Sequence, residues 1–144
     1  MAGYSNIPLA TKLGIKKDHR VAVINAPNGF RQTLGQLPEG VSLREDGRAS
    51  AFDVMVFFTS SRAELAQRFS SLARRLCPAG GLWIAWPKKA SGTPTDLIED
   101  RVREIGLTAG LVDNKVCAVD EIWSGLRFVF RRKDRPPPQG KSPK

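Results

Sequence analysis

Residues 52–58, FDVMVFF, limit the fold more than any other segment of this chain. They are apolar at nearly every position, and such a run is typical of a strand that other elements cover on both faces. A sheet buried on both faces is usually parallel, with helices above and below it. The segment therefore predicts the central strand of an α/β domain.

Strand and helix signals alternate along the rest of the chain. Shorter apolar runs predict strands at residues 20–25, 41–44, 82–86, 111–119 and 126–130, and helical patterns occur at residues 7–13 and 30–37. Ser61 and Glu64 have the spacing of a capping box, and they predict a helix that ends before the turn at residues 78–81. Asp96 and Glu99 have the same spacing and predict a second long helix.

The order strand, helix, strand, helix calls for right-handed crossovers and a parallel sheet. The last two strands are joined by a turn of six residues, DEIWSG, and should form an antiparallel hairpin at one edge. This layout resembles the Rossmann-like methyltransferase fold, with residues 52–86 as its fourth strand, following helix and fifth strand. One strand–helix unit is missing between Arg44 and Phe52. We expect one such domain over residues 1–131.

Three short motifs carry a second resemblance. The segments Trp86-Pro87-Lys88-Lys89, Thr95-Asp96-Leu97 and Trp123-Ser124-Gly125-Leu126 resemble the small bacterial proteins grouped as domain of unknown function 3052. The likeness spans residues 3–132. It implies a single small domain and no particular chemistry.

The formal net charge of +9 is divided between the expected domain and a tail at residues 132–144. The tail, RKDRPPPQGKSPK, has five basic residues and one acid, and no apolar residue except proline, so we expect it to be disordered. Such a tail could add weak, salt-sensitive attraction to nucleic acid. No apolar run is long enough for a membrane span and the amino terminus lacks the apolar core of a signal peptide, so we expect a cytoplasmic protein without a membrane partner.

The loop after the first strand determines whether a methyltransferase cofactor could bind. It consists of residues 25–29, NAPNG, of which only Gly29 is glycine, although the family's cofactor loop needs glycines for close backbone approach. We therefore predict no cofactor. Glu45 lies 20 residues after Asn25, where a ribose-binding acid could stand, or it is an exposed loop residue.

Ligands of open α/β sheets bind outside the carboxyl ends of the strands, so the loops that leave these ends are the candidate site. Lysines, hydroxyls and free helix N–H groups there would suit a small anion such as a phosphate or carboxylate. The candidate ligand-binding residues are Asn25, Ser60, Lys88, Lys89, Ser91, Thr95, Asp120 and Trp123. The alternatives are that Lys88 and Lys89 form a solvated turn and that Trp123 covers the sheet edge.

The function that we expect from these patterns is non-catalytic binding of a small anionic ligand or a protein partner at the carboxyl edge. The alternatives are a divergent transferase that uses S-adenosylmethionine or a nucleotide, with Asp120 or Glu121 as base, and a weak nucleic-acid binder. Catalysis by Cys117 is disfavoured because His19, the single histidine, precedes the first strand and so lies at the other end of the sheet. Neither a metal motif nor an oligomeric state follows from the sequence.

Overall fold

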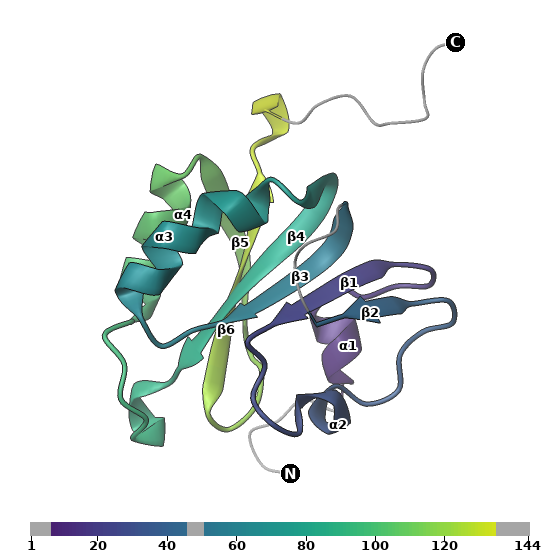
Figure 1. Cartoon of the computed structure of the whole chain (residues 1–144), viewed down its shortest axis with the longest axis horizontal. Helices are drawn as coiled ribbons and strands as arrows, with labels where there is room; N and C mark the ends of the chain where they lie inside the picture. The colour runs from purple at the N-terminus through teal and green to yellow at the C-terminus, as the bar shows by residue number, and fades with distance from the viewer. Residues whose placement is uncertain (1–6, 46–50, 135–144) are drawn as a thin grey trace.

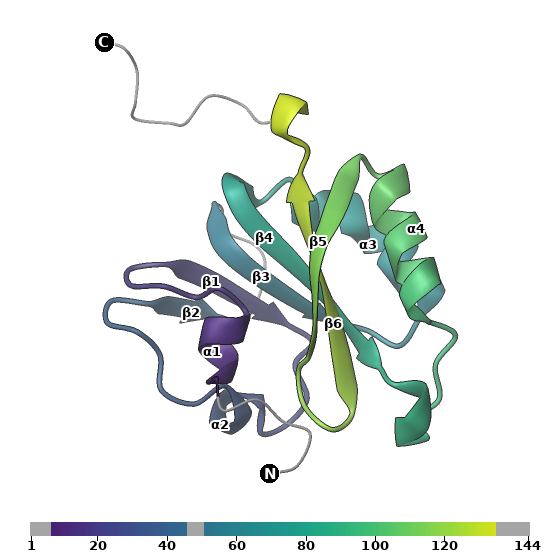
Figure 2. The same cartoon turned by 180° about the vertical axis from the view of Figure 1, so that it is seen from behind.

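The computed structural model describes residues 7–45 and 51–134, which form one six-stranded sheet with helices on both faces (Figures 1 and 2). The strands are β1 (Arg20–Ile24), β2 (Ser42–Arg44), β3 (Phe52–Phe58), β4 (Leu76–Pro87), β5 (Leu111–Ala118) and β6 (Trp123–Phe130). The helices are α1 (Leu9–Lys12), α2 (Phe30–Leu34), α3 (Arg62–Ala73) and α4 (Glu99–Thr108), with short 3-10 turns at η1 (Lys89–Ser91) and η2 (Arg132–Asp134).

The strand order is β2-β1-β3-β4-β6-β5. The first four strands in this order are parallel, and β6 and β5 close the sheet as an antiparallel hairpin. The predictions that β3 is a central strand and that a hairpin forms one edge are confirmed. Only residues 45–51 separate β2 from β3, which leaves no room for the further strand–helix unit of a Rossmann-like methyltransferase.

The core lies in two layers, one on each face of the sheet. In β3, Met55 and Phe57 face the layer under α3 and α4, whereas Val54, Val56 and Phe58 face the layer under α1 and α2. All five are at most 2% exposed. This burial on both faces is the reason why the strand is apolar at nearly every position.

The start of β4 corrects one prediction. The segment Pro78 to Gly81 was expected to be a turn, but it lies inside a strand that begins at Leu76. The pairing of β3 with β4 shifts register between Phe52 and Val54, and a Cβ on Gly80 would lie 2.9 Å from two backbone oxygens of β3. Gly80 therefore serves the close approach of two strands at an irregular pairing.

The start of α4 corrects a second prediction. The residue before the helix is Ile98, and Asp96 does not cap α4. The Oδ1 atom of Asp96 instead accepts a hydrogen bond of 2.7 Å from the backbone N–H of Arg62, in the first turn of α3. The predicted cap of α3 is confirmed, because Ser61 Oγ accepts from the backbone N–H of Glu64 at 3.1 Å. Two side chains therefore satisfy the amino terminus of α3.

The predicted tail falls outside the described residues except for η2. Within residues 7–45 and 51–134, no helix has both the length and the apolar character that a membrane span requires.

Candidate functional site

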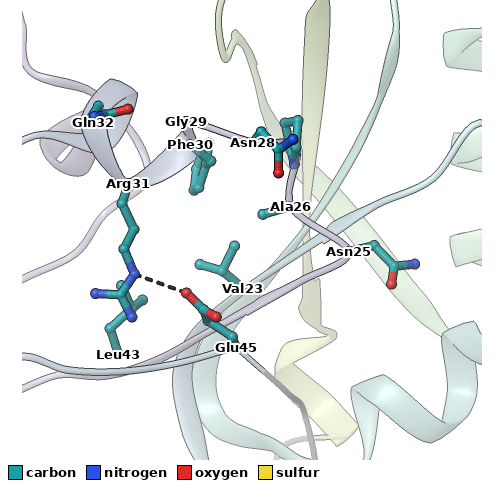
Figure 3. A pocket seen from close by; sticks show the side chains of 11 residues that line it. Val23, Asn25, Ala26, Asn28, Gly29, Phe30, Arg31, Gln32, Leu43 and Glu45 are labelled. Carbon is teal, nitrogen blue, oxygen red and sulfur yellow. Dashed lines mark hydrogen bonds and ion pairs between the residues drawn. The ribbon is translucent and has the colours of Figure 1, made fainter.

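A cleft of about 380 Å³ opens at the carboxyl ends of β1 and β2 (Figure 3). We call it the β1–β2 cleft. Its wall is formed by the turn after β1, the first residues of α2 and the end of β2; the lining residues are Val23, Asn25, Ala26, Pro27, Asn28, Gly29, Phe30, Arg31, Gln32, Leu43 and Glu45. The rule that ligands of open α/β sheets bind at this edge makes the cleft the candidate site.

The turn after β1 is sharp because two of its residues have a left-handed backbone. Asn25 has φ 59° and Gly29 has φ 84°, a conformation that asparagine tolerates and glycine adopts freely. The backbone N–H of Phe30 donates to Pro27 O at 3.1 Å, which closes the turn. Phe30 then packs edge to face on Phe58, with ring centroids 4.9 Å apart, and this contact anchors α2 to the sheet.

Arg31 and Glu45 face each other across the β1–β2 cleft (Figure 3). The Arg31 Nε atom donates to Glu45 Oε2 at 2.9 Å, and the two side chains are 62% and 69% exposed. An ion pair this exposed contributes little to stability and can rearrange at little cost. Its two charges cancel, so the described lining of the cleft carries no net charge.

A second polar group at the carboxyl edge joins β1, β3 and α3. The carboxylate of Glu64 accepts a hydrogen bond of 2.6 Å from Thr59 Oγ1 and one of 3.4 Å from Asn25 Nδ2. Thr59 is 4% exposed, so this hydroxyl needs a partner inside the fold, and the charged carboxylate is a strong acceptor. The Asn25 side chain is thus directed toward α3 and away from Glu45 (Figure 3).

The loops after β4 and β5 are tied together by their own side chains. Lys88 Nζ donates to the backbone oxygen of Asp120 at 2.8 Å, and Ser91 Oγ donates to Lys88 O at 2.7 Å. Asp120 Oδ1 accepts from the backbone N–H groups of Ile122 and Trp123, each at 2.8 Å, and so closes the hairpin turn. Lys88, Ser91 and Asp120 therefore stabilise the loops through these contacts.

The other predicted residues are also drawn into local contacts. Thr95 Oγ1 donates to Ser60 O at 2.8 Å, which joins the loop after β3 to the one after β4. Trp123 packs edge to face against Phe58 of the central strand β3 with centroids 5.1 Å apart, so it lies on a face of the sheet and does not cover its edge. Lys89 begins η1 and is exposed. Of the eight predicted residues, Asn25 alone lines the β1–β2 cleft.

Sequence reasoning missed Arg31 and the contacts of Glu64. Arg31 lies on a short helix with no motif, and its pairing with Glu45 depends on where β2 ends. Glu64 was noted only for its capping-box spacing, which gives no sign that its carboxylate reaches Asn25 and Thr59. Glu45 could be found, because its distance of 20 residues from Asn25 is a sequence signal.

Neither metal nor thiol chemistry is assembled in the part of the chain that the structure describes. Among residues 7–45 and 51–134, no group of histidine, cysteine and acidic side chains could hold a metal ion. Cys77 and Cys117 are free and half-buried, and burial raises the pKa of both thiols. Both thiols are therefore less reactive than an ordinary cysteine.

No protein-family model matches the chain, and no curated protein sequence matches it. The resemblance to domain of unknown function 3052 therefore stays a prediction. Solved structures do match over most of the chain. A SAM-dependent methyltransferase from Aquifex aeolicus superposes with a TM-score of 0.58 and 15% identity, over 83% of this chain and 86% of the other.

Two further structures agree. A TehB-like SAM-dependent methyltransferase from Corynebacterium glutamicum has a TM-score of 0.54 and 10% identity, over 90% of this chain and 91% of the other. Fibrillarin from Aeropyrum pernix, solved with natively bound S-adenosyl-L-methionine, has a TM-score of 0.54 and 14% identity, over 88% of this chain and 70% of the other. At such identities the likeness shows the fold alone. The domain has a Rossmann-like, methyltransferase-like α/β fold, as predicted.

Proposed function

We propose that this domain binds a nucleoside-containing small molecule in the β1–β2 cleft and does not itself catalyse group transfer. The position of Glu45 carries the proposal. Glu45 follows β2 directly and lines the same cleft as the turn after β1. In α/β domains that bind dinucleotides, an acid about 20 residues beyond that turn accepts hydrogen bonds from the ribose hydroxyls.

The rest of the cleft suits a flat ring beside a sugar. Val23 and Phe30 are buried at its base, and Leu43 is half-buried beside them. Apolar side chains of this kind pack against a base, and a few polar groups at the rim orient it. Because the charges of Arg31 and Glu45 cancel, the cleft favours a neutral nucleoside over the small anion expected from the sequence.

The methionine half of S-adenosylmethionine does not fit the turn after β1. Pro27 supplies no N–H donor, and the amide of Asn25 donates to Glu64. The backbone N–H of Phe30 donates to Pro27 O. We expect the affinity of S-adenosylmethionine to come from its nucleoside half alone. Two free cysteines agree with the cytoplasmic location expected from the sequence.

Isothermal titration calorimetry with adenosine and with S-adenosylmethionine tests the proposal. We expect both to bind with similar dissociation constants, about 0.1–1 mM, because they share the nucleoside. Glu45→Gln should weaken adenosine at least about tenfold, which corresponds to one charge-assisted hydrogen bond. Glu39→Gln, which removes an exposed acid outside the cleft, is the matched control.

Arg31→Gln separates a ligand role of Glu45 from a structural one. This change frees the carboxylate of Glu45, so adenosine should bind at least as well as to the parent. If Arg31→Gln weakened adenosine as much as Glu45→Gln, the ion pair would be the element that matters and the proposal would fail. A low-micromolar dissociation constant for S-adenosylmethionine, with adenosine far weaker, would support the divergent transferase instead.

A further inference from the structure

A second pocket, of about 390 Å³, opens at the opposite end of the parallel strands. His19 lies just before β1 and Asp53 at the start of β3, so the pocket is at the amino edge of the sheet. Its charged and polar lining also includes Lys12, Lys16, Lys115 and Arg127. Four basic side chains against one carboxylate give this lining a formal net charge of +3 with His19 neutral. We call it the basic pocket.

We propose that the basic pocket is a binding site for a phosphorylated small molecule, held through its phosphate or diphosphate group. The site is separate from the β1–β2 cleft and does not depend on the function proposed for that cleft.

The cations of the basic pocket come from segments that are far apart in the sequence. Lys12 ends α1, Lys16 lies in the loop before β1, and Lys115 and Arg127 lie on β5 and β6. A run of charge along one helix or loop is usually a solvated surface, but here the fold itself brings the charges to one concave place. An anion in that place would contact several elements at once, which is how specific phosphate sites are built.

Lys115 and Arg127 are direct partners across the β5–β6 hairpin. Two like charges in opposed positions on neighbouring strands destabilise a sheet. The register that opposes them follows a shift in the pairing between Asp113 and Lys115, so a bulge in β5 brings Lys115 opposite Arg127. A dianion between the two side chains would reverse the sign of this interaction.

Several contacts hold the wall of the basic pocket in place. Lys115 Nζ donates to Lys12 O at 3.1 Å, and this bond joins β5 to the end of α1. Trp83 Nε1, buried in the core, donates to Leu13 O at 3.0 Å. A Cβ on Gly81 would collide with the guanidinium of Arg127, so this glycine lets the arginine lie against β4. The site is therefore largely preformed.

The remaining polar groups leave donors for a ligand. Among the described residues, the side chains of Lys12 and Lys16 make no hydrogen bond or ion pair. His19 Nδ1 accepts from the backbone N–H of Lys16 at 3.1 Å, so the neutral imidazole carries its proton on Nε2 and can donate. The carboxylate of Asp53 accepts from the backbone N–H of Arg20 at 2.8 Å and carries the single opposing charge.

The shape of the basic pocket favours a small ligand over nucleic acid. Its volume of about 390 Å³ is in the range of small-molecule sites. Single-stranded nucleic acid is bound along a groove with aromatic platforms for the bases, and no phenylalanine, tyrosine or tryptophan is among the described lining residues.

Calorimetric titration of the full chain with sodium pyrophosphate at constant ionic strength tests this proposal, with inorganic phosphate as the smaller probe. We expect one saturable site for pyrophosphate and weaker binding of phosphate. Lys12→Gln with Lys16→Gln should weaken pyrophosphate at least about tenfold, because each removed cation lies at the pocket and neither side chain supports the fold. Thermal melts show that the variant is folded.

Lys17→Gln with Lys89→Gln is the matched control, since it removes the same charge from exposed lysines that do not line the pocket. It should change the dissociation constant less than about twofold. Equal weakening in both double variants would show diffuse attraction and overturn the proposal, as would the absence of saturable binding. A short single-stranded oligonucleotide that bound more tightly than pyrophosphate and resisted its competition would assign the surface to nucleic acid instead.

Discussion

The two ends of the sheet hold cavities of nearly equal volume, about 380 and 390 Å³, with opposite electrostatic character. The β1–β2 cleft at the carboxyl ends is lined by one arginine and one glutamate that bond to each other. The basic pocket at the amino ends combines four cations with one carboxylate. In this molecule, therefore, the cavity with the excess of positive charge is not at the end of the sheet where ligands of α/β domains usually bind.

The difference comes from what the polar side chains are used for. At the carboxyl edge, Lys88 and Thr95 bond to the backbone of neighbouring loops, and Asp120 bonds to the backbone of its own turn. At the amino edge, Lys115 also bonds to a backbone oxygen, but the side chains of Lys12 and Lys16 have no such bond within the described residues. Lysines and hydroxyl side chains thus indicate an anion site only where they are not already hydrogen-bonded within the fold.

The largest effect is expected from substitutions in the core that both ends of the sheet share. Phe57 is fully buried under α3, and Phe57→Ala should cost about 3–5 kcal/mol of unfolding free energy through lost contacts and a cavity. Leu72→Ala in the same layer should cost about 2–5 kcal/mol.

Chemical denaturation with urea measures both changes. The exposed Val116→Ala, which leaves the core intact, serves as control and should change the stability by less than about 0.5 kcal/mol. Near-parental stability in the Phe57 and Leu72 variants would contradict the two-layer core.

Salt should separate the two ends of the sheet. Raising sodium chloride from about 0.05 to 0.2 M should weaken pyrophosphate in the basic pocket about tenfold, because screening acts on several charge pairs. Adenosine in the neutral β1–β2 cleft should change less than about twofold. Parallel titrations at the two salt concentrations measure this, and equal salt dependence for both ligands would remove the electrostatic distinction.

Thr59 tests how much the hydrogen bonds at the carboxyl edge contribute to stability. Thr59→Val keeps the shape but removes the donor to Glu64, and it should lower the unfolding free energy by about 1–2 kcal/mol. Ser60→Ala removes an exposed hydroxyl next to it and should be nearly neutral. If the two variants had equal stability, Thr59 would not be the tie between β3 and α3 that its geometry indicates.

The smallest expected effect is a change in the pKa of Cys117, which serves as a probe of the basic pocket. Burial raises the pKa of this thiol, and the nearby cations Lys12 and Lys115 lower it in part. Lys12→Gln removes one of these cations, so the pKa should rise further and alkylation at a fixed pH near 9 should become slower. The rate of iodoacetamide labelling against pH, in a Cys77→Ser background, measures the shift.

Saturating pyrophosphate should shift the labelling curve in the same direction, because bound anion offsets the lysine charges. A shift toward lower pH in either experiment would contradict the electrostatics described for the pocket.

The sheet could be predicted from the sequence because its signals are local. The run FDVMVFF indicates burial on both faces wherever it is placed, and Ser61 with Glu64 marks a helix start within four residues. Asp96 and Glu99 have the same spacing, but here the predicted cap is wrong. Asp96 lies in the loop before α4 and accepts a hydrogen bond from a free N–H group of α3. Capping spacing does not reveal which helix a side chain will cap.

The candidate sites were harder to predict because they depend on register. Glu45 lies at the cleft because β2 ends directly before it, and a three-residue strand gives little sequence signal. The opposition of Lys115 and Arg127 needs the exact pairing of β5 with β6, bulge included. A shift of one residue would send either side chain to the other face, so no inspection of single segments finds the basic pocket.

The bond from Lys115 Nζ to Lys12 O joins residues 103 positions apart, whereas the β1–β2 cleft is built within residues 23–45. A contact of such long sequence separation requires a long loop to close, which costs entropy and slows folding. A chain leaving the ribosome can complete the β1–β2 cleft once β3 has been made, because Phe30 packs on Phe58 and β1 pairs with β3, but it cannot assemble the basic pocket until the hairpin has been synthesised. Anion binding at the amino edge would then require that the β5–β6 hairpin is in place, whereas ligand binding in the β1–β2 cleft would not.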